Sequence, residues 1–228
     1  MNRIVEPELL DSLSPADLRA VGSRRDLRRI NWWMRNHAIL ANALEANLSP
    51  NSKNFIELGA GDGHLLLALA KKMSRHRPVV NVTLLDLQKN VSEETLALFA
   101  SLGWPAKEVV EDVFDWTPSG DASAIVIANL FLHHFVDERL AELLRNISRN
   151  AKLFVAVEPR RFGWPSAVGP LLRAIGCNDI TRHDAVVSIR AGFSCEELSA
   201  LWPDKTNWQL TERRAGLFSH LFIARRLE

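Results

Sequence analysis

The chain has 228 residues, of which 47% are hydrophobic, and a formal net charge of +1 at pH 7. This length and composition are enough for one domain with a substantial buried core, and the near-neutral charge argues against a general electrostatic grip on nucleic acid. The two cysteines, Cys177 and Cys195, have neither metal-ligand spacing nor a disulfide framework. Residues 1–13 contain acids but no long apolar run, so neither a signal peptide nor a membrane span is expected, and the sequence predicts a cytoplasmic protein.

The N-terminal part predicts helical structure. Residues 1–22 indicate a loosely ordered lead-in with a short helical turn after Ser14 and Pro15. From Ser23, a candidate N-cap, apolar residues recur every three or four positions as far as Leu44, which predicts one long helix that stops near Pro50. We expect residues 1–50 to form a helical cap and residues 51–228 to form the main domain. The other faces of the helix carry arginines, either as a solvated face or as a surface for an anion: Arg24, Arg25, Arg28, Arg29 and Arg35.

The most informative stretch is residues 55–67, which reads as strand, tight turn and helix. An apolar run ends in Glu57, and glycines follow at alternate positions, Gly59, Gly61 and Gly63. Glycine permits positive φ and a close approach of a ligand to the main chain, and the helix predicted over 64–75 offers unpaired N–H groups at its start. The sequence therefore predicts a cofactor-binding turn.

The spacing of the glycines indicates which cofactor. A dinucleotide fingerprint would place glycine at position 64, where this chain has His64. Instead, the pattern Glu-x-Gly-x-Gly-x-Gly resembles motif I of class I S-adenosylmethionine-dependent methyltransferases. S-adenosyl-L-methionine has no phosphate but carries an amino group, a carboxylate and a sulfonium, which suit backbone donors beside an acid. The resemblance assigns cofactor binding to Glu57, Gly59, Ala60, Gly61, Asp62 and Gly63.

The same resemblance implies the fold. It is an α/β fold with a doubly wound, mostly parallel seven-stranded sheet, a closing antiparallel C-terminal hairpin and an N-terminal helical lid. A β-rich run over 81–86 predicts the second strand and ends in Asp86, where a Rossmann-like fold places the carboxylate that binds the ribose hydroxyls. Alternatively, Asp86 caps a helix over 91–101. In the family pattern, motif II would place Leu87 and Gln88 beside the adenosine.

Two further strand ends complete the expected cofactor site. The run 107–115 predicts the third strand, and by resemblance Asp112, Val113 and Phe114 would lie at the adenine ring, although acids at strand ends are often plain loop residues. The apolar run 124–130 predicts a central strand buried on both faces. By resemblance, its end is motif IV, beside the transferable methyl group, with Asn129 and Leu130 at the cofactor.

The segment that follows, Phe131 to Phe135, contains the Leu-His-His sequence that many small-molecule members of the family carry. No Asn/Asp-Pro-Pro-Tyr segment, no pair of glutamates as in protein arginine methyltransferases and no extra carboxylate beside Asn129 is present. We therefore expect a metal-independent enzyme that acts on a small molecule.

The remaining elements are predicted with ordinary signals. A helix over 136–149 and a strand over 152–157 precede a capping box formed by Ser194 and Glu197. Two β-rich runs, 208–214 and 218–224, are joined at Ala215-Gly216 and indicate the closing hairpin. Residues 159–192 remain as an insert at the carboxyl edge of the sheet, where we expect substrate selection.

Methyl transfer requires alignment of the acceptor with the methyl group, and a phenol with a pKa near about 10 also benefits from a general base. Histidine is suited to this role. Our preferred candidate is His134, followed by His133 and by His183, which Asp184 could orient. The alternatives are that the first two pack or cap the next helix and that His183 has a surface role.

The preferred function is O-methylation of a small, largely apolar phenolic or polyketide-like acceptor. Candidate acceptor-binding residues are Asn31, Trp33, Met34, Glu158, Arg160, Trp164 and Arg190. Alternatives are a C-methyltransferase on an activated aromatic ring, an RNA methyltransferase or binding module that uses the arginines of 24–35, and a noncatalytic S-adenosylmethionine-binding protein. The sequence leaves the oligomeric state open.

Overall fold

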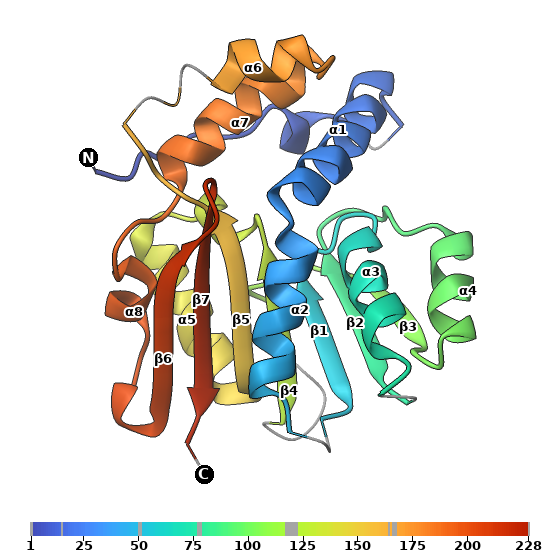
Figure 1. Ribbon diagram of the computed structural model, residues 1–228, viewed down its shortest axis with the longest axis vertical. Coiled ribbons are helices and arrows are strands. Elements are labelled where there is room, and N and C mark those ends of the chain that lie inside the picture. Colours follow the sequence, from blue (N-terminus) through green and yellow to red (C-terminus); the bar gives the residue numbers. More distant parts are fainter. Residues whose placement is uncertain are drawn as a thin grey trace.

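The computed structural model describes residues 2–14, 16–49, 52–76, 79–116, 123–163, 165 and 168–227. Its centre is a seven-stranded sheet with the order β3-β2-β1-β4-β5-β7-β6 (Figure 1). The strands are β1 (Asn54–Leu58), β2 (Asn81–Asp86), β3 (Ala106–Val110), β4 (Ala124–Asn129), β5 (Ala151–Pro159), β6 (Trp208–Ala215) and β7 (Ser219–Arg226). Strands β1 to β5 pair in parallel, and β7 is antiparallel to both of its neighbours. The predicted fold class, including the closing hairpin, is confirmed.

Helices cover both faces of this sheet, each with its own hydrophobic core. The helices are α1 (Leu18–Met34), α2 (Asn36–Asn47), α3 (His64–Met73), α4 (Glu93–Ser101), α5 (Asp137–Asn150), α6 (Val168–Ala174), α7 (Asp179–Ala191) and α8 (Glu197–Leu201). Apolar side chains of α2, α3 and α4 pack on one face, and those of α5 and α8 pack on the other. Helices α1, α6 and α7 lie beyond the carboxyl ends of the parallel strands (Figure 1).

The prediction of one long N-terminal helix is wrong. The helix begins earlier, at Leu18, where the side chain of Asp17 accepts a hydrogen bond from a main-chain N–H of the first turn, and Ser23 is buried rather than a cap. It is then interrupted at Arg35, whose φ of +57° is left-handed, and α2 starts anew at Asn36. The expected cap over 1–50 therefore divides into α1, which lies over the sheet edge, and α2, which packs on the sheet.

The lead-in is bound to the rest of the molecule rather than loose. Residues 2–13, here called the N-terminal strap, include a 3₁₀ turn at Leu10–Ser12. The carboxylate of Asp184 on α7 accepts the N–H groups of Leu9 at 2.9 Å and Leu10 at 3.0 Å. The N–H of Ile4 donates to the carbonyl of Arg190 at 3.2 Å. These contacts hold the strap along α7.

Buried polar contacts also join α1 to the insert. The carboxylate of Asp26 accepts the N–H of Asn178 at 2.9 Å, and the hydroxyls of Ser23 and Thr181 lie 2.9 Å apart. Because these groups are buried and satisfied by one another, separating α1 from α7 would leave them unpaired. The N-terminal helix and the insert thus form one structure above the sheet.

The end of β3 and the start of α8 differ from prediction. Strand β3 ends at Val110, since Asp112 begins a turn in which its carboxylate accepts the N–H of Phe114 at 2.9 Å. Ser194 is not an N-cap: α8 begins only at Glu197, whose carboxylate accepts the N–H of Ser194 at 2.8 Å as in half of a capping box. Among the described residues, no helix has the length and apolarity needed to cross a bilayer.

Candidate active site

The turn after β1 requires its glycines. The φ angles are +64° at Gly59, +54° at Gly61 and +73° at Gly63, all in the left-handed region. Gly59 has a second constraint, because a Cβ atom there would lie 2.2 Å from the ring of Phe131. The turn therefore presents bare main chain at the start of α3.

Asp86 fixes this turn against the end of β2. One carboxylate oxygen accepts the N–H of Gly61 at 2.8 Å and the other accepts the N–H of Gln88 at 2.9 Å. Burial raises the pKa of Asp86, while these hydrogen bonds oppose the increase. The cap of the next helix is Ser92, so the alternative capping role for Asp86 is wrong. Each oxygen has a further lone pair that a hydroxyl could use.

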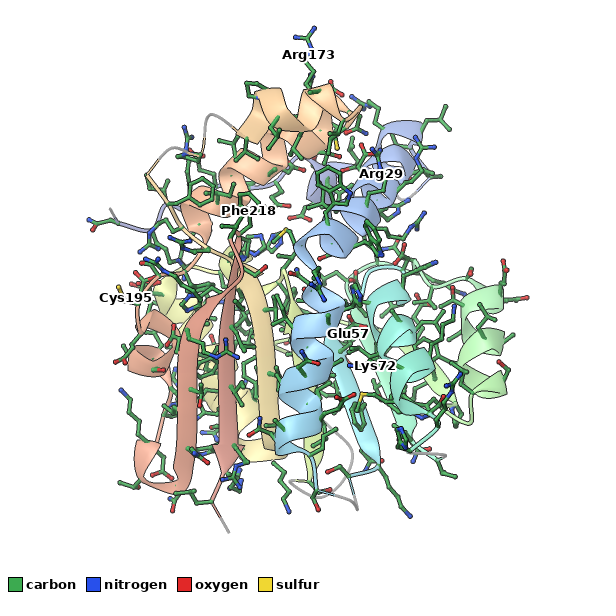
Figure 2. All side chains as sticks on the ribbon, viewed as in Figure 1. Arg29, Glu57, Lys72, Arg173, Cys195 and Phe218 are labelled. Carbon is green, nitrogen blue, oxygen red and sulfur yellow. The ribbon has the colours of Figure 1, made fainter. Side chains whose placement is uncertain are left out.

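Glu57 is a buried acid with an unsatisfied atom. Glu57 belongs to β1 and is labelled near the middle of Figure 2; the residue is 2% exposed, and Oε2 has no hydrogen-bond partner among the described residues. Burial, together with the charges of Asp62 and Asp86, raises the pKa of Glu57 well above its ordinary value. A buried carboxyl oxygen without a partner is costly, so a cationic group in the adjacent cleft would supply the missing interaction.

An aromatic wall lies beyond the third strand. Phe114 packs edge-on against Phe135, with ring centroids 5.3 Å apart, and the guanidinium of Arg139 lies 3.6 Å from the centre of the Phe114 ring. Asp112 and Val113 line the same cleft as Phe114. This part of the cleft offers flat apolar surface beside a carboxylate.

Three asparagines meet where α1, α2 and β4 converge. The amide nitrogen of Asn36 donates to Asn31 and to Asn129, both at 2.9 Å, and Asn129 donates to Asn31 at 3.2 Å. The hydroxyl of Ser219 donates to the amide oxygen of Asn36 at 2.8 Å, which ties the cluster to β7. Leu130 follows with a φ of +52°. The interruption at Arg35 brings Asn36 into this cluster.

His133 lies between two carboxylates. Its Nδ1 is 2.8 Å from Glu158 Oε2, its Nε2 is 3.2 Å from Glu8 Oε1, and it is 2% exposed. Burial lowers the pKa of His133, but the hydrogen bonds and charges of Glu158 and Glu8 outweigh burial and raise the pKa to about 9. Burial raises the pKa of Glu8, but the bond to His133 prevails and brings it to about 2. His133 is therefore an imidazolium at neutral pH.

His134 and His183 have different surroundings. The side chain of His134 is 24% exposed, lines the cleft, and has its Nδ1 at 3.3 Å from a carboxylate oxygen of Asp11 in the N-terminal strap. His183 lies on α7 with its Nδ1 at 3.0 Å from Asp184, is 49% exposed, and is not among the described residues that line the cleft. Of the three histidines, only His134 combines access to the cleft with a nitrogen that is not bonded to a second carboxylate.

Glu8, His133 and His134 are the described residues that come close to a metal-ligand set, with ligand atoms within 4.8 Å of one another. However, both ring nitrogens of His133 are already bonded to carboxylates. A metal ion would have to displace the bond to Glu8. The expectation of metal-independent activity stays a prediction.

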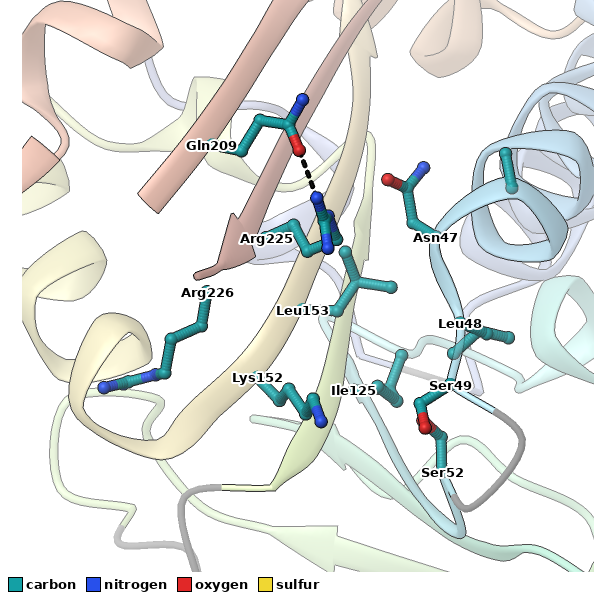
Figure 3. A pocket seen from close by; sticks show the side chains of 11 residues that line it. Asn47, Leu48, Ser49, Ser52, Ile125, Lys152, Leu153, Gln209, Arg225 and Arg226 are labelled. Carbon is teal, nitrogen blue, oxygen red and sulfur yellow. Dashed lines mark hydrogen bonds between the residues drawn. The ribbon is translucent and has the colours of Figure 1, made fainter. Parts of the chain in front are cut away.

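These groups share one cleft of about 1030 Å³ at the carboxyl edge of the sheet. Small-molecule pockets have volumes of about 300–1,000 Å³, so this cleft has room for a cofactor and an acceptor together. A second hollow, of about 630 Å³, lies at the opposite edge, where Arg225 donates to Gln209 (Figure 3). It contains none of the predicted site residues.

The predicted acceptor-binding residues fall into two groups. Asn31, Trp33 and Met34 line the cleft. Glu158, Arg160 and Arg190 are absent from its described lining because their groups are engaged elsewhere: Glu158 binds His133 and the N–H groups that follow β4, Arg160 donates to Leu217 O at 3.1 Å, and Arg190 lies 3.7 Å from Glu6. Trp164 lies outside the described residues.

Sequence reasoning did not identify Glu8 or Asp11 as site residues. Glu8 and Asp11 are separated from the histidines by more than 100 positions and belong to a segment without periodicity, so no local signal marks them. Only the tertiary structure brings Glu8 and Asp11 to the cleft, beside the histidines.

Comparison with known proteins agrees with this geometry. Residues 55–152 match the family described as a methyltransferase domain, and no curated protein matches the sequence significantly. The plantazolicin methyltransferase BpumL in complex with S-adenosylhomocysteine has a similar structure, with a TM-score of 0.65 and 12% identity over 93% of this chain and 92% of that chain.

Two further structures are similar. A putative O-methyltransferase from Nostoc punctiforme PCC 73102 has a TM-score of 0.61 and 14% identity over 90% of this chain and 60% of that chain. The pyocyanin biosynthetic protein PhzM has a TM-score of 0.57 and 18% identity over 93% of this chain and 60% of that chain. At these identities the likeness shows the fold.

The sheet order, the glycine turn and the acids at the strand ends define an enzyme with the class I, Rossmann-like methyltransferase fold. The class predicted from the motifs, an S-adenosylmethionine-dependent methyltransferase, agrees with the match of residues 55–152 to a methyltransferase domain and with the fold. The site fits S-adenosyl-L-methionine, because Glu57 offers one unpartnered buried carboxyl oxygen to a cation and Asp86 retains acceptor capacity for hydroxyls. The predicted cofactor is confirmed.

Proposed function

We propose that the protein methylates the hydroxyl group of a small, largely apolar phenolic or polyketide-like acceptor, with His134 as the general base. The observation that carries this proposal is the position of His134: it lines the same cleft as the glycine turn, close after the end of β4, and pairs with Asp11. A base at this point of the cleft is useful only for an acceptor that must lose a proton.

S-adenosylmethionine supplies the electrophilic methyl group. The chain's own residues hold and align the reactants. Glu57 and Asp86 bind the cofactor, and the asparagine cluster fixes Asn129 at the end of β4. The aromatic wall of Phe114 and Phe135 keeps water away. Ideal alignment lowers such barriers by as much as about 7–11 kcal/mol, so positioning is the larger contribution.

Proton removal falls to His134. A carboxylate beside Nδ1 favours the tautomer with the proton on Nδ1, which leaves Nε2 as the acceptor. A general base contributes about 10²- to 10⁴-fold in rate. His133 does not suit this role because its pKa of about 9 keeps it protonated and both nitrogens face carboxylates.

The arrangement of α1 disfavours a nucleic-acid substrate. Arg28 lies 2.5 Å from Asp62, and Arg29 lies 3.1 Å from Asp26 and donates to Ile175 O at 2.6 Å. These guanidiniums already have partners within the protein, so they do not offer a free stripe to phosphates. A cytoplasmic location is part of the same proposal, since Cys177 and Cys195 are both free thiols.

The test is a screen of the purified protein against phenols, hydroxyquinones and carboxylic acids, with release of S-adenosylhomocysteine as the readout. Mass spectrometry and NMR then locate the added methyl. Methylation of oxygen in an apolar phenol is the expected result. Methylation at carbon, or turnover restricted to carboxylic acids or RNA, would contradict the proposal.

A further inference from the structure

Four exposed apolar side chains line the cleft. Trp32 and Trp33 at the end of α1, Leu171 on α6 and Phe218 in the turn between β6 and β7 all line the cleft, and they are 67%, 64%, 55% and 38% exposed. These four residues are here called the apolar rim. Phe218 lies in the middle of the view in Figure 2, beneath α6 and α7.

The hairpin side of the rim is held in place. The N–H of Arg160 donates to Phe218 O at 2.7 Å, and its guanidinium donates to Leu217 O at 3.1 Å. The ring of Phe218 also lies 6.2 Å from that of Phe162. A turn bonded in this way keeps Phe218 at the cleft, so its exposure is part of the fold.

Exposed apolar groups that continue inward as the lining of a cleft indicate a ligand rather than a flat partner surface. The rim comes from three separate elements that line one cleft, and its four side chains carry no formal charge. A ligand held wholly inside the cleft would leave these side chains in water. A hydrocarbon chain that emerges from the cleft would cover them.

We propose that the acceptor is an amphiphile, with a hydroxylated head methylated beside His134 and a long hydrocarbon chain that leaves the cleft across the apolar rim. This inference rests on the proposed function and extends it from a small apolar acceptor to a long-chain class. The chain is bound by burial of apolar surface, so affinity depends on its length rather than on polar groups along it.

The test is calorimetric titration of 4-ethyl-, 4-butyl-, 4-hexyl- and 4-octylphenol into protein saturated with S-adenosylhomocysteine, below the aqueous solubility limit of each phenol. Each added methylene that is buried should raise affinity about three- to fourfold. Binding is measured without turnover. Failure of the proposed O-methylation would therefore appear as absent or carbon-directed methyl transfer, whereas failure of this inference would appear as affinity that does not change with chain length.

Variants assign the effect to the rim. Phe218→Ser and Trp33→Gln should each reduce the gain per methylene while leaving the affinity for S-adenosylhomocysteine unchanged. Leu98→Ser, at a 39% exposed position on α4, is the matched control and should leave the gain intact. Equal affinity across the series, or a gain that both rim variants preserve, would overturn the proposal. Binding to phosphatidylcholine–phosphatidylglycerol vesicles without chain-length dependence would also overturn it, by assigning the rim to a bilayer.

Discussion

Glu8 and His133, 125 positions apart in the sequence, are joined by a contact of 3.2 Å between Glu8 Oε1 and His133 Nε2. The contact attaches the N-terminal strap to the segment after β4. Ser188 on α7 also donates to Glu8, and Glu158 holds the other side of the imidazole. One ion cluster therefore connects the strap, the insert and the sheet on the side of the cleft that is proposed to bind the acceptor.

This cluster should make stability fall at alkaline pH. The pKa of His133 is raised from 6.5 to about 9 in the folded protein, so its contribution is fully present below pH 6.5 and is lost as the pH rises through about 9. This shift in pKa corresponds to about 3 kcal/mol of folding free energy. Urea unfolding between pH 6 and pH 10 measures it. A His133→Gln variant should lack this part of the pH dependence. If the free energy of unfolding changed equally with pH in both proteins, the assignment to His133 would be contradicted.

Glu8→Gln should lower the pKa of His133 in the folded protein, so that the contribution of His133 to stability is lost at a lower pH. The carboxamide keeps the shape but removes one of the two charges that stabilise the imidazolium. Direct titration of the His133 ring by NMR gives the pKa in both proteins. An unchanged value would mean that Glu158 alone sets it.

His134→Ala should lower kcat by about 10²- to 10⁴-fold with little change in affinity for S-adenosylhomocysteine. The loss should shrink for phenols of lower pKa, whose ionised form needs less help. Asp11→Asn should produce a smaller loss, because the base remains but its tautomer is no longer fixed. His76→Ala, at an exposed histidine, is the control. Full activity of His134→Ala would leave alignment as the whole mechanism.

Asp86→Ala should weaken cofactor binding by about 1–3 kcal/mol, which is the typical cost of leaving buried donors, here the ribose hydroxyls of the cofactor, without an acceptor. The N–H groups of Gly61 and Gln88 would both lose their partner. Calorimetry with S-adenosylhomocysteine measures the change, and Asp115→Ala, at an exposed acid, is the control. Wild-type affinity in Asp86→Ala would exclude Asp86 from the cofactor site.

Gly59→Ala and Gly61→Ala form a matched pair. Both residues have left-handed φ, so each substitution should cost about 1–2 kcal/mol from the backbone alone. Only at Gly59 would the new methyl meet a ring, and this overpacking should add about 1–3 kcal/mol. Denaturant unfolding measures both, and Phe131→Leu should recover part of the difference. Equal costs would show that the ring of Phe131 moves away freely.

Dialysis against EDTA should leave methyl transfer intact. Among the described residues, Glu8, His133 and His134 come near a ligand set, and two of them already bond to each other. Turnover is compared before and after chelation and after addition of magnesium or zinc. Complete loss that either ion restores would contradict metal independence.

The cofactor half of the site was predictable because its signals are local. Glycines that require positive φ, an acid at the end of a β-rich run and an apolar strand are all read from adjacent residues, and β2 and β4 appear where their patterns predicted them. The acceptor half was less predictable. Its histidines could be named, but their protonation depends on Glu8, Asp11 and Glu158, which approach them only in the folded chain.

The single interruption at Arg35 also escaped prediction. Apolar periodicity continues across it because α1 and α2 both have apolar faces, so the pattern alone favoured one helix. The reason for the break is tertiary: Asn36 is completely buried and bonds to Asn31, Asn129 and Ser219, which an uninterrupted helix would not position in the same way. The hydrogen bonds that these buried amides form outweigh the helical hydrogen bonds that are lost at the break.

The apolar rim is built from the end of α1, from α6 and from a hairpin turn, whereas the glycine turn and Asp86 belong to the sheet. Substitutions at the four rim positions therefore leave the strands and their packed cores untouched. A combinatorial library confined to Trp32, Trp33, Leu171 and Phe218 should yield folded, cofactor-competent enzymes at high frequency. Directed evolution of new acceptor preferences can thus begin without prior stabilisation of the scaffold.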